Sequence, residues 1–206
     1  FAVRHTVILN VSDGSPIKTM NIAVYSGSFN PLHIGHLAIM KHLIEEAGFD
    51  MVYLIVSPKN PLKDGISSDS GRDRYNAALA AVARHFAPKS EVKVDDIELT
   101  MPEPHYTIRT LDALREREPE NEFTLVMGAD NLADIRRWRD YARILKEFGV
   151  AVFPREGHDL TEIKQDLLKE DPAYMIQILD AEMVDISSTQ IRESIARGED
   201  ISHCLM

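Results

Sequence analysis

The chain has 206 residues, of which 44% are hydrophobic and 27% charged, so it can bury a sizeable core and is not an intrinsically disordered chain. Its 33 acidic residues outnumber the 23 Lys and Arg residues, and the net charge of −10 disfavours binding to nucleic acid. The single cysteine, Cys204, excludes a disulfide framework and favours a reducing, cytoplasmic compartment, and no apolar run is long enough to span a membrane.

The first 19 residues differ in pattern from the rest of the chain. Residues 12–16 are rich in turn formers, and Met20 then opens an apolar, strand-like run. We expect residues 1–19 to be an N-terminal extension, whether native or added, and residues 20–206 to form a single domain whose C-terminal part is helical. The pattern is equally compatible with an extra edge strand over Thr6–Val11.

From Ile22 onward, short apolar runs alternate with helical patterns. The predicted strands are Ile22–Tyr25, Met51–Val56, Val92–Leu99, Phe123–Met127, Val150–Phe153 and Met175–Leu179. The predicted helices are His33–Ala47, Arg72–Phe86, Thr107–Glu116, helical pieces between Asn131 and Phe148, Leu160–Lys169 and Ser188–Arg197, with turns at Gly27–Pro31 and Gly128–Asn131. This alternation predicts an α/β fold, in which helices cover both faces of a parallel sheet and ligands bind at the carboxyl ends of the strands.

The first candidate phosphate site is the stretch 26–36, which lies between a predicted strand and a predicted helix and reads Ser-Gly-Ser-Phe-Asn-Pro-Leu-His-Ile-Gly-His. Gly27 permits a ligand to approach the backbone, and the N-terminus of the following helix attracts anions. His33 and His36 are three residues apart, so both imidazoles share one helix face, with Gly35 between them. Such a pair can stabilise charge that develops on phosphoryl oxygens, although an ordinary surface pair has the same spacing. A zinc site is less favoured, because the sequence nearby offers no obvious third ligand.

The second candidate phosphate site is the stretch 186–192, which reads Ile-Ser-Ser-Thr-Gln-Ile-Arg. Ser187 or Ser188 is a good helix N-cap, which by itself explains the pattern. The hydroxyls, the free N–H groups of the first helical turn and the fork of Arg192 also suit a terminal phosphate. The pattern alone leaves both interpretations open.

Together, the two motifs resemble the H-x-G-H and I-S-S-T-x-x-R signatures of the nucleotidyltransferase superfamily, and the resemblance to its adenylyltransferases extends from about residue 21 to residue 197. Stretches 57–63, 104–111 and 128–132, with Trp138 beyond, are similar to the lysine loop, the Tyr-Thr-x-x-Thr-Leu segment and the G-x-D turn with its following aromatic residue in nicotinate-nucleotide adenylyltransferases. The chain departs from that family by having Asn30 in place of an aspartate, Leu62 in place of a histidine and Arg109 in place of an acid.

The resemblance implies a Rossmann-like, doubly wound nucleotidyltransferase domain over residues 20–206. It implies transfer of AMP from ATP to nicotinate mononucleotide in NAD biosynthesis, with release of pyrophosphate. The acceptor phosphate is already ionised at neutral pH, because its second pKa is about 6, so no strong general base is needed. Mg²⁺ would be bound through the ATP phosphates, with no dedicated protein ligands.

The resemblance also assigns roles to individual residues. The catalytic set is His33, His36 and Arg192. The expected ATP-binding residues are Gly27, Ser28, Phe29, Gly35, Gly128, Asp130, Ile186, Ser187, Ser188 and Thr189. The expected acceptor-binding residues are Lys63, Tyr106, Thr107 and Trp138.

Several of these assignments have simpler alternatives. Asp130 and Thr107 are also plausible helix caps, Trp138 a core residue and Lys63 a solvated loop residue. For Arg72 and Arg74, near a helix start, a solvated face is favoured over a nearby anion. The alternative functions are adenylyl transfer to phosphopantetheine or another acceptor, and a non-catalytic nucleotide-binding regulator; a cytidylyltransferase and a class I aminoacyl-tRNA synthetase fit less well. The sequence predicts no particular oligomeric state.

Overall fold

The computed structural model describes residues 8–9, 16–58, 70–86, 91–181 and 188–206. Three of the expected site residues, Lys63, Ile186 and Ser187, lie outside these ranges. Their assignments therefore stay predictions.

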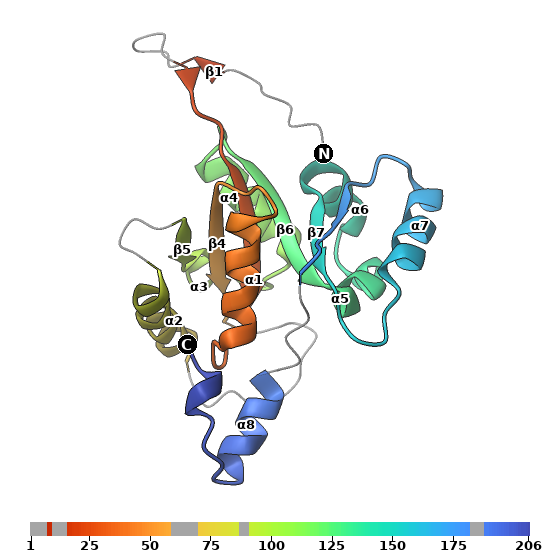
Figure 1. Cartoon of the computed structure of the whole chain (residues 1–206). Coiled ribbons are helices and arrows are strands. Elements are labelled where there is room, and N and C mark those ends of the chain that lie inside the picture. The colour runs from red at the N-terminus through yellow and green to blue at the C-terminus, as the bar shows by residue number, and fades with distance from the viewer. Residues whose placement is uncertain (1–7, 10–15, 59–69, 87–90, 182–187) are drawn as a thin grey trace.

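In the part of the chain that the structure describes, the centre of the domain is a six-stranded sheet with the order β5-β4-β3-β6-β7-β8 (Figure 1). Its strands are β3 (Asn21–Gly27), β4 (Met51–Val56), β5 (Val92–Asp95), β6 (Glu122–Gly128), β7 (Val150–Phe153) and β8 (Ile176–Ile178). Every neighbouring pair is parallel. The order runs outward from β3 to β5 and then outward in the other direction from β6 to β8, so the doubly wound parallel sheet predicted from the sequence is confirmed.

Helices flank this sheet (Figure 1). The helical segments are α1 (Ile34–Glu45), α2 (Gly71–His85), α3 (Ile97–Thr100), α4 (Thr107–Arg117), α5 (Ala129–Ala133), η1 (Ile135–Arg137), α6 (Tyr141–Arg143), η2 (Ile144–Phe148), α7 (Leu160–Glu170), α8 (Ser188–Ala196) and η3 (Ser202–Cys204). Among the described residues, none of the helices is long and apolar enough to cross a membrane.

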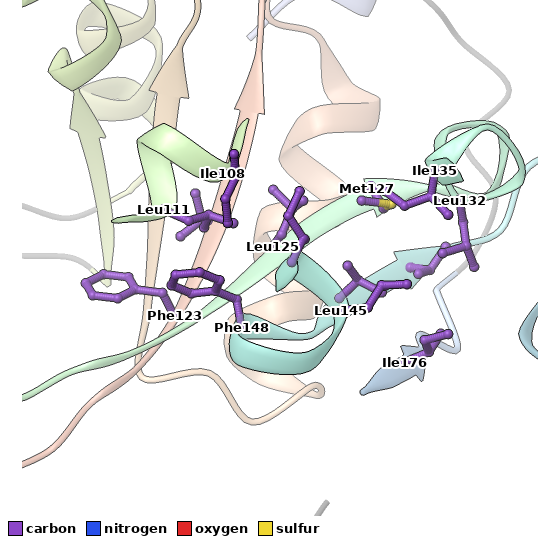
Figure 2. Close-up of a cluster of buried hydrophobic side chains, with 14 of the residues drawn as sticks. Ile108, Leu111, Phe123, Leu125, Met127, Leu132, Ile135, Leu145, Phe148 and Ile176 are labelled. Atoms are coloured by element: carbon purple, nitrogen blue, oxygen red, sulfur yellow. The ribbon is translucent and has the colours of Figure 1, made fainter. Parts of the chain in front are cut away.

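The apolar residues divide into two cores, one on each face of the sheet. Successive strand residues point to opposite faces, so Ile22 and Val24 of β3 enter one core while Ala23 and Tyr25 enter the other. The first core packs strand residues against α4, α5, η2 and α7, as Figure 2 shows for Leu111, Leu125 and Phe148. The second core packs them against α1 and α2. Both faces are thereby buried, which explains why the central strands are apolar almost throughout.

The N-terminal segment forms a small sheet of its own. Strand β1 (Ile8–Leu9) pairs antiparallel with β2 (Pro16–Ile17), and neither joins the six-stranded sheet. An extra edge strand of the main sheet is therefore not observed at these residues. The assignment of residues 1–19 to an extension, and of residues 20–206 to a single domain, stays a prediction.

Two predictions differ from the structure by more than a residue or two at the end of an element. The strand expected over Val92–Leu99 ends at Asp95, because the Asp95 carboxylate accepts a hydrogen bond from the Ile97 N–H at 3.0 Å and turns the chain into helix α3. The turn expected at Gly128–Asn131 is also wrong, because β6 continues through Gly128 and α5 begins at the next residue.

Candidate active site

The predicted nucleotide-binding stretches lie where the strand order reverses. Strand β3 ends at Gly27 and its parallel neighbour β6 ends at Gly128, so both glycines lie at the carboxyl edge of the sheet, beside the switch point. In doubly wound sheets this is where ligands bind. The fold therefore brings the first motif and the segment beginning at Gly128 to one place.

Phe29 organises the loop between β3 and α1. Its backbone has a φ of 43°, in the left-handed region that non-glycine residues seldom occupy, yet its ring is buried. The ring makes edge contacts with Tyr25 and His36, at centroid distances of 5.3 and 5.1 Å. It also covers Gly27, where a Cβ atom would lie 3.1 Å from Phe29 Cζ. The requirement for glycine at this position thus comes from the ring above it.

The two motif histidines lie against each other at the start of α1. Their ring centroids are 3.7 Å apart, and the His33 side chain is buried. The His33 backbone N–H donates a hydrogen bond to His36 Nδ1 at 3.2 Å. In a neutral imidazole the other nitrogen then carries the proton, so His36 keeps its Nε2–H as a hydrogen-bond donor.

Burial keeps both imidazoles neutral near pH 7. It lowers the pKa of His33 to about 4, with a further contribution from the nearby positive charge of Arg155. Burial, followed by the neighbouring His33 and by Arg155, holds the pKa of His36 well below 6.5. A neutral histidine still carries one N–H group, so it can donate a hydrogen bond to a phosphoryl oxygen without first being protonated.

The second motif contacts the first directly. Arg192 on α8 donates one hydrogen bond to the Asn30 carbonyl at 2.8 Å and another to the Thr189 hydroxyl at 2.9 Å. Ser188 donates to the Pro31 carbonyl at 3.2 Å. These contacts bridge about 160 residues of sequence and hold the start of α8 beside the loop that precedes the two histidines. The guanidinium of Arg192 remains exposed at this junction.

The β6 side of the site is formed by Gly128, Asp130 and Phe153. Asp130 is exposed in the first turn of α5, whose N-cap is Gly128, so the alternative role of Asp130 as N-cap is not observed. A Cβ atom at Gly128 would collide with the Asp130 carboxylate and approach Phe153 Cε2 to 3.1 Å. The absence of a side chain at Gly128 therefore leaves room for the Asp130 carboxylate beside the end of β6.

Three of the expected acceptor residues are described: Tyr106 and Thr107 at the start of α4, and Trp138 after η1. Thr107 begins α4, and Tyr106 precedes it with 38% of its surface exposed. Trp138 is half-buried and packs against the first core, as its simpler interpretation predicts. Among the described residues, its indole N–H has no hydrogen-bond partner.

Comparison with known proteins identifies the family. A family model described as cytidylyltransferase-like matches residues 24–194. The probable nicotinate-nucleotide adenylyltransferase of Flavobacterium johnsoniae is 38% identical over 186 residues, which cover 90% of this chain and 92% of that protein. Its counterpart from Flavobacterium psychrophilum is 39% identical over 187 residues, with the same coverage. The chain belongs to the nicotinate-nucleotide adenylyltransferase family.

Solved structures agree with this assignment at the level of the fold. The Plasmodium falciparum nicotinic acid mononucleotide adenylyltransferase complexed with NaAD superposes with a TM-score of 0.70 at 19% identity, covering 89% of this chain and 87% of that one. The Rossmann-like fold predicted for this adenylyltransferase is confirmed.

The structure adds three charged residues to the site that the sequence interpretation missed. Arg155 follows β7 at the carboxyl edge, lies with its guanidinium carbon 5.0 Å from the Phe153 ring centroid, and pairs with no carboxylate among the described residues. Its position just after a predicted strand was the available signal. Arg74, for which a solvated face was expected, is only 4% exposed, which corrects that expectation. Glu98 is also buried and was hidden by the strand predicted through it.

Proposed function

We propose that this adenylyltransferase transfers the adenylyl group of ATP to nicotinate mononucleotide, with His33, His36 and Arg192 as its catalytic residues. The observation that carries the proposal is the contact of Arg192 with the Asn30 carbonyl, which sets the second motif beside the two histidines of the first. Two phosphate-binding segments from opposite ends of the domain converge there, as a triphosphate requires.

The reaction forms a bond between an acceptor phosphate oxygen and the α-phosphorus of ATP. The bond from that phosphorus to the bridging oxygen of pyrophosphate breaks, and pyrophosphate leaves. Because the attacking phosphate is ionised near pH 7, the protein has to align the reactants and stabilise charge rather than remove a proton.

The neutral histidines and the arginines divide this work. The Nε2–H of His36 donates to a phosphoryl oxygen as negative charge grows on it, and His33, whose ring lies against that of His36, contacts the triphosphate beside it. Arg192, with Ser187 and Thr189, holds the outer phosphates. Arg155, which follows β7, adds a positive charge near His33 and His36.

The nucleotide substrate is proposed to be the magnesium complex of ATP. Within the described ranges, no three His, Cys, Asp or Glu side chains converge to hold a metal ion. By resemblance, Mg²⁺ would be bound through the ATP phosphates and would supply neutralisation of the charge on the leaving pyrophosphate.

The proposed binding site for nicotinate mononucleotide uses residues around α4 and η1 together with Lys63. Trp138 would stack on the pyridine ring, Tyr106 and Thr107 would contact its carboxylate, and Lys63 would bind the acceptor phosphate. A cytoplasmic location stays a prediction from the single cysteine.

The catalytic assignment is tested by substituting two arginines of the same helical region. Arg192→Ala removes the fork that joins the motifs, whereas Arg197→Ala removes an exposed guanidinium that ion-pairs with Glu199 at 2.6 Å. We expect Arg192→Ala to lower kcat/KM for pyrophosphate release by roughly 10²–10³-fold and Arg197→Ala to leave it unchanged. Equal activity of the two variants would refute the role of Arg192, and ATP binding without pyrophosphate release by the wild type would indicate a regulator instead.

A further inference from the structure

Glu98 is a buried acid at the carboxyl edge of the sheet that the proposed chemistry does not use. It is 4% exposed, and no basic side chain pairs with it among the residues that the structure describes. Three hydroxyl groups satisfy it instead: Ser57 Oγ at 2.5 Å, Thr110 Oγ1 at 2.9 Å and Ser26 Oγ at 3.3 Å. Burying a carboxylate without a cation is unfavourable, so core stability alone does not account for this residue.

The three hydroxyls come from segments that serve different substrates. Ser26 is the penultimate residue of β3, just before the loop over residues 28–33 that joins β3 to α1 and that we call the phosphate loop. Ser57 follows β4 and begins the stretch that leads to Lys63. Thr110 lies one turn into α4, the helix that begins at the proposed acceptor residue Thr107. Glu98 therefore joins the ATP side of the site to two acceptor-side segments.

Arg74 contacts two of the same segments, those that follow β3 and β4. It extends from α2 with 4% of its surface exposed. Its Nη1 donates to the Ser28 carbonyl at 2.6 Å and to the Ser57 carbonyl at 2.8 Å, and its Nη2 donates to the Pro58 carbonyl at 2.8 Å. One guanidinium thus holds the backbone of the phosphate loop and the backbone that follows β4.

Ser57 is where the two buried charged residues meet. Its hydroxyl donates to Glu98, its carbonyl accepts from Arg74, and its N–H donates to the Gly27 carbonyl at 2.9 Å. The backbone and side chain of Ser57 are both hydrogen-bonded, so the end of β3 and the start of the lysine loop are tied together.

We propose that Glu98 and Arg74, acting through Ser57, are positioning residues that set the acceptor relative to the α-phosphate of ATP. This inference rests on the proposed function. Neither residue needs to touch a substrate, because each holds segments that do. In-line attack depends steeply on alignment, and a displacement of about 1 Å is enough to slow such a reaction on the order of 100-fold. We call Glu98, Arg74 and Ser57, with the hydrogen bonds that they make, the brace. Because the brace sets alignment, we expect it to affect turnover more than the binding of either substrate alone.

The test compares variants that remove parts of the brace with one that removes a buried hydrogen bond elsewhere. Glu98→Gln keeps the shape of the side chain, and Thr110→Val deletes one donor at a fully buried position. The control, Tyr53→Phe, deletes the 2.7 Å bond from Tyr53 to Glu118 on strand β4, away from the carboxyl edge. Thermal unfolding and steady-state pyrophosphate release from Mg-ATP and nicotinate mononucleotide are measured for each.

We expect Glu98→Gln and Thr110→Val to lower kcat by roughly 10- to 100-fold while both KM values stay within about threefold, and Tyr53→Phe to lower the melting temperature with kcat unchanged. Brace variants that melt earlier but keep the wild-type kcat would overturn the proposal. If Glu98→Gln does not fold, Thr110→Val and Ser57→Ala decide by the same criterion. An inactive wild type would refute the proposed function, whereas an active wild type with equally active variants would refute only the brace.

Discussion

His33 should make the folded state lose stability as the pH falls below 7. Its pKa is lowered from 6.5 to about 4 because it is buried, so between these values the unfolded chain binds a proton that the folded chain does not. Its stabilising contribution is complete above pH 6.5 and is lost progressively as the pH falls toward 4. From pH 7 to pH 5, this single group removes about 2 kcal/mol from the free energy of unfolding.

The assay is urea unfolding of the wild type, His33→Asn and His85→Asn at both pH values. The difference between pH 7 and pH 5 should be about 2 kcal/mol smaller in His33→Asn than in the wild type, because the variant has no buried imidazole to protonate at that position. His85, exposed at the end of α2, is the matched control, and its variant should keep the wild-type difference. The same pH sensitivity in all three proteins would refute the argument that His33 is kept neutral by burial.

Three further substitutions test the packing and the acceptor site. Gly27→Ala places a Cβ atom 3.1 Å from a Phe29 ring that is confined on two sides, so urea unfolding should show a loss of about 1–3 kcal/mol; unchanged stability would mean that the ring yields freely. Leu111→Ala, at a position with no exposed surface, should cost about 2–5 kcal/mol in the same assay while kcat per folded molecule stays normal, and a loss below 1 kcal/mol would contradict the core assignment. Trp138→Ala should raise the KM for nicotinate mononucleotide about 3- to 10-fold in steady-state kinetics and leave the KM for ATP unchanged, whereas equal effects on both would contradict stacking on the acceptor.

The sheet was predictable because each of its strands carries a strong local signal. Met51–Val56 and Val150–Phe153 were predicted to the residue, since both are continuous apolar runs bounded by polar, glycine or proline residues. Val92–Leu99 was predicted too long, because its strand ends at a hydrogen bond from the Ile97 N–H to the Asp95 carboxylate. Hydropathy does not encode such a bond.

The site was predictable where a motif marks it and not where tertiary contacts create it. The two histidines and Arg192 were found from short patterns, and the structure brings their segments together. Glu98 and Arg74 have no comparable pattern, since their significance comes from burial and from partners on other elements. Sequence spacing alone cannot show that Ser26, Ser57 and Thr110 share one buried carboxyl group.

The most direct test of the central claim is pyrophosphate release from Mg-ATP by the wild-type chain with three acceptors in parallel: nicotinate mononucleotide, nicotinamide mononucleotide and phosphopantetheine. We predict release chiefly with nicotinate mononucleotide, and no release when the acceptor is omitted. Release chiefly with either of the other acceptors would contradict the acceptor assignment, and no release with any of them would contradict adenylyl transfer itself.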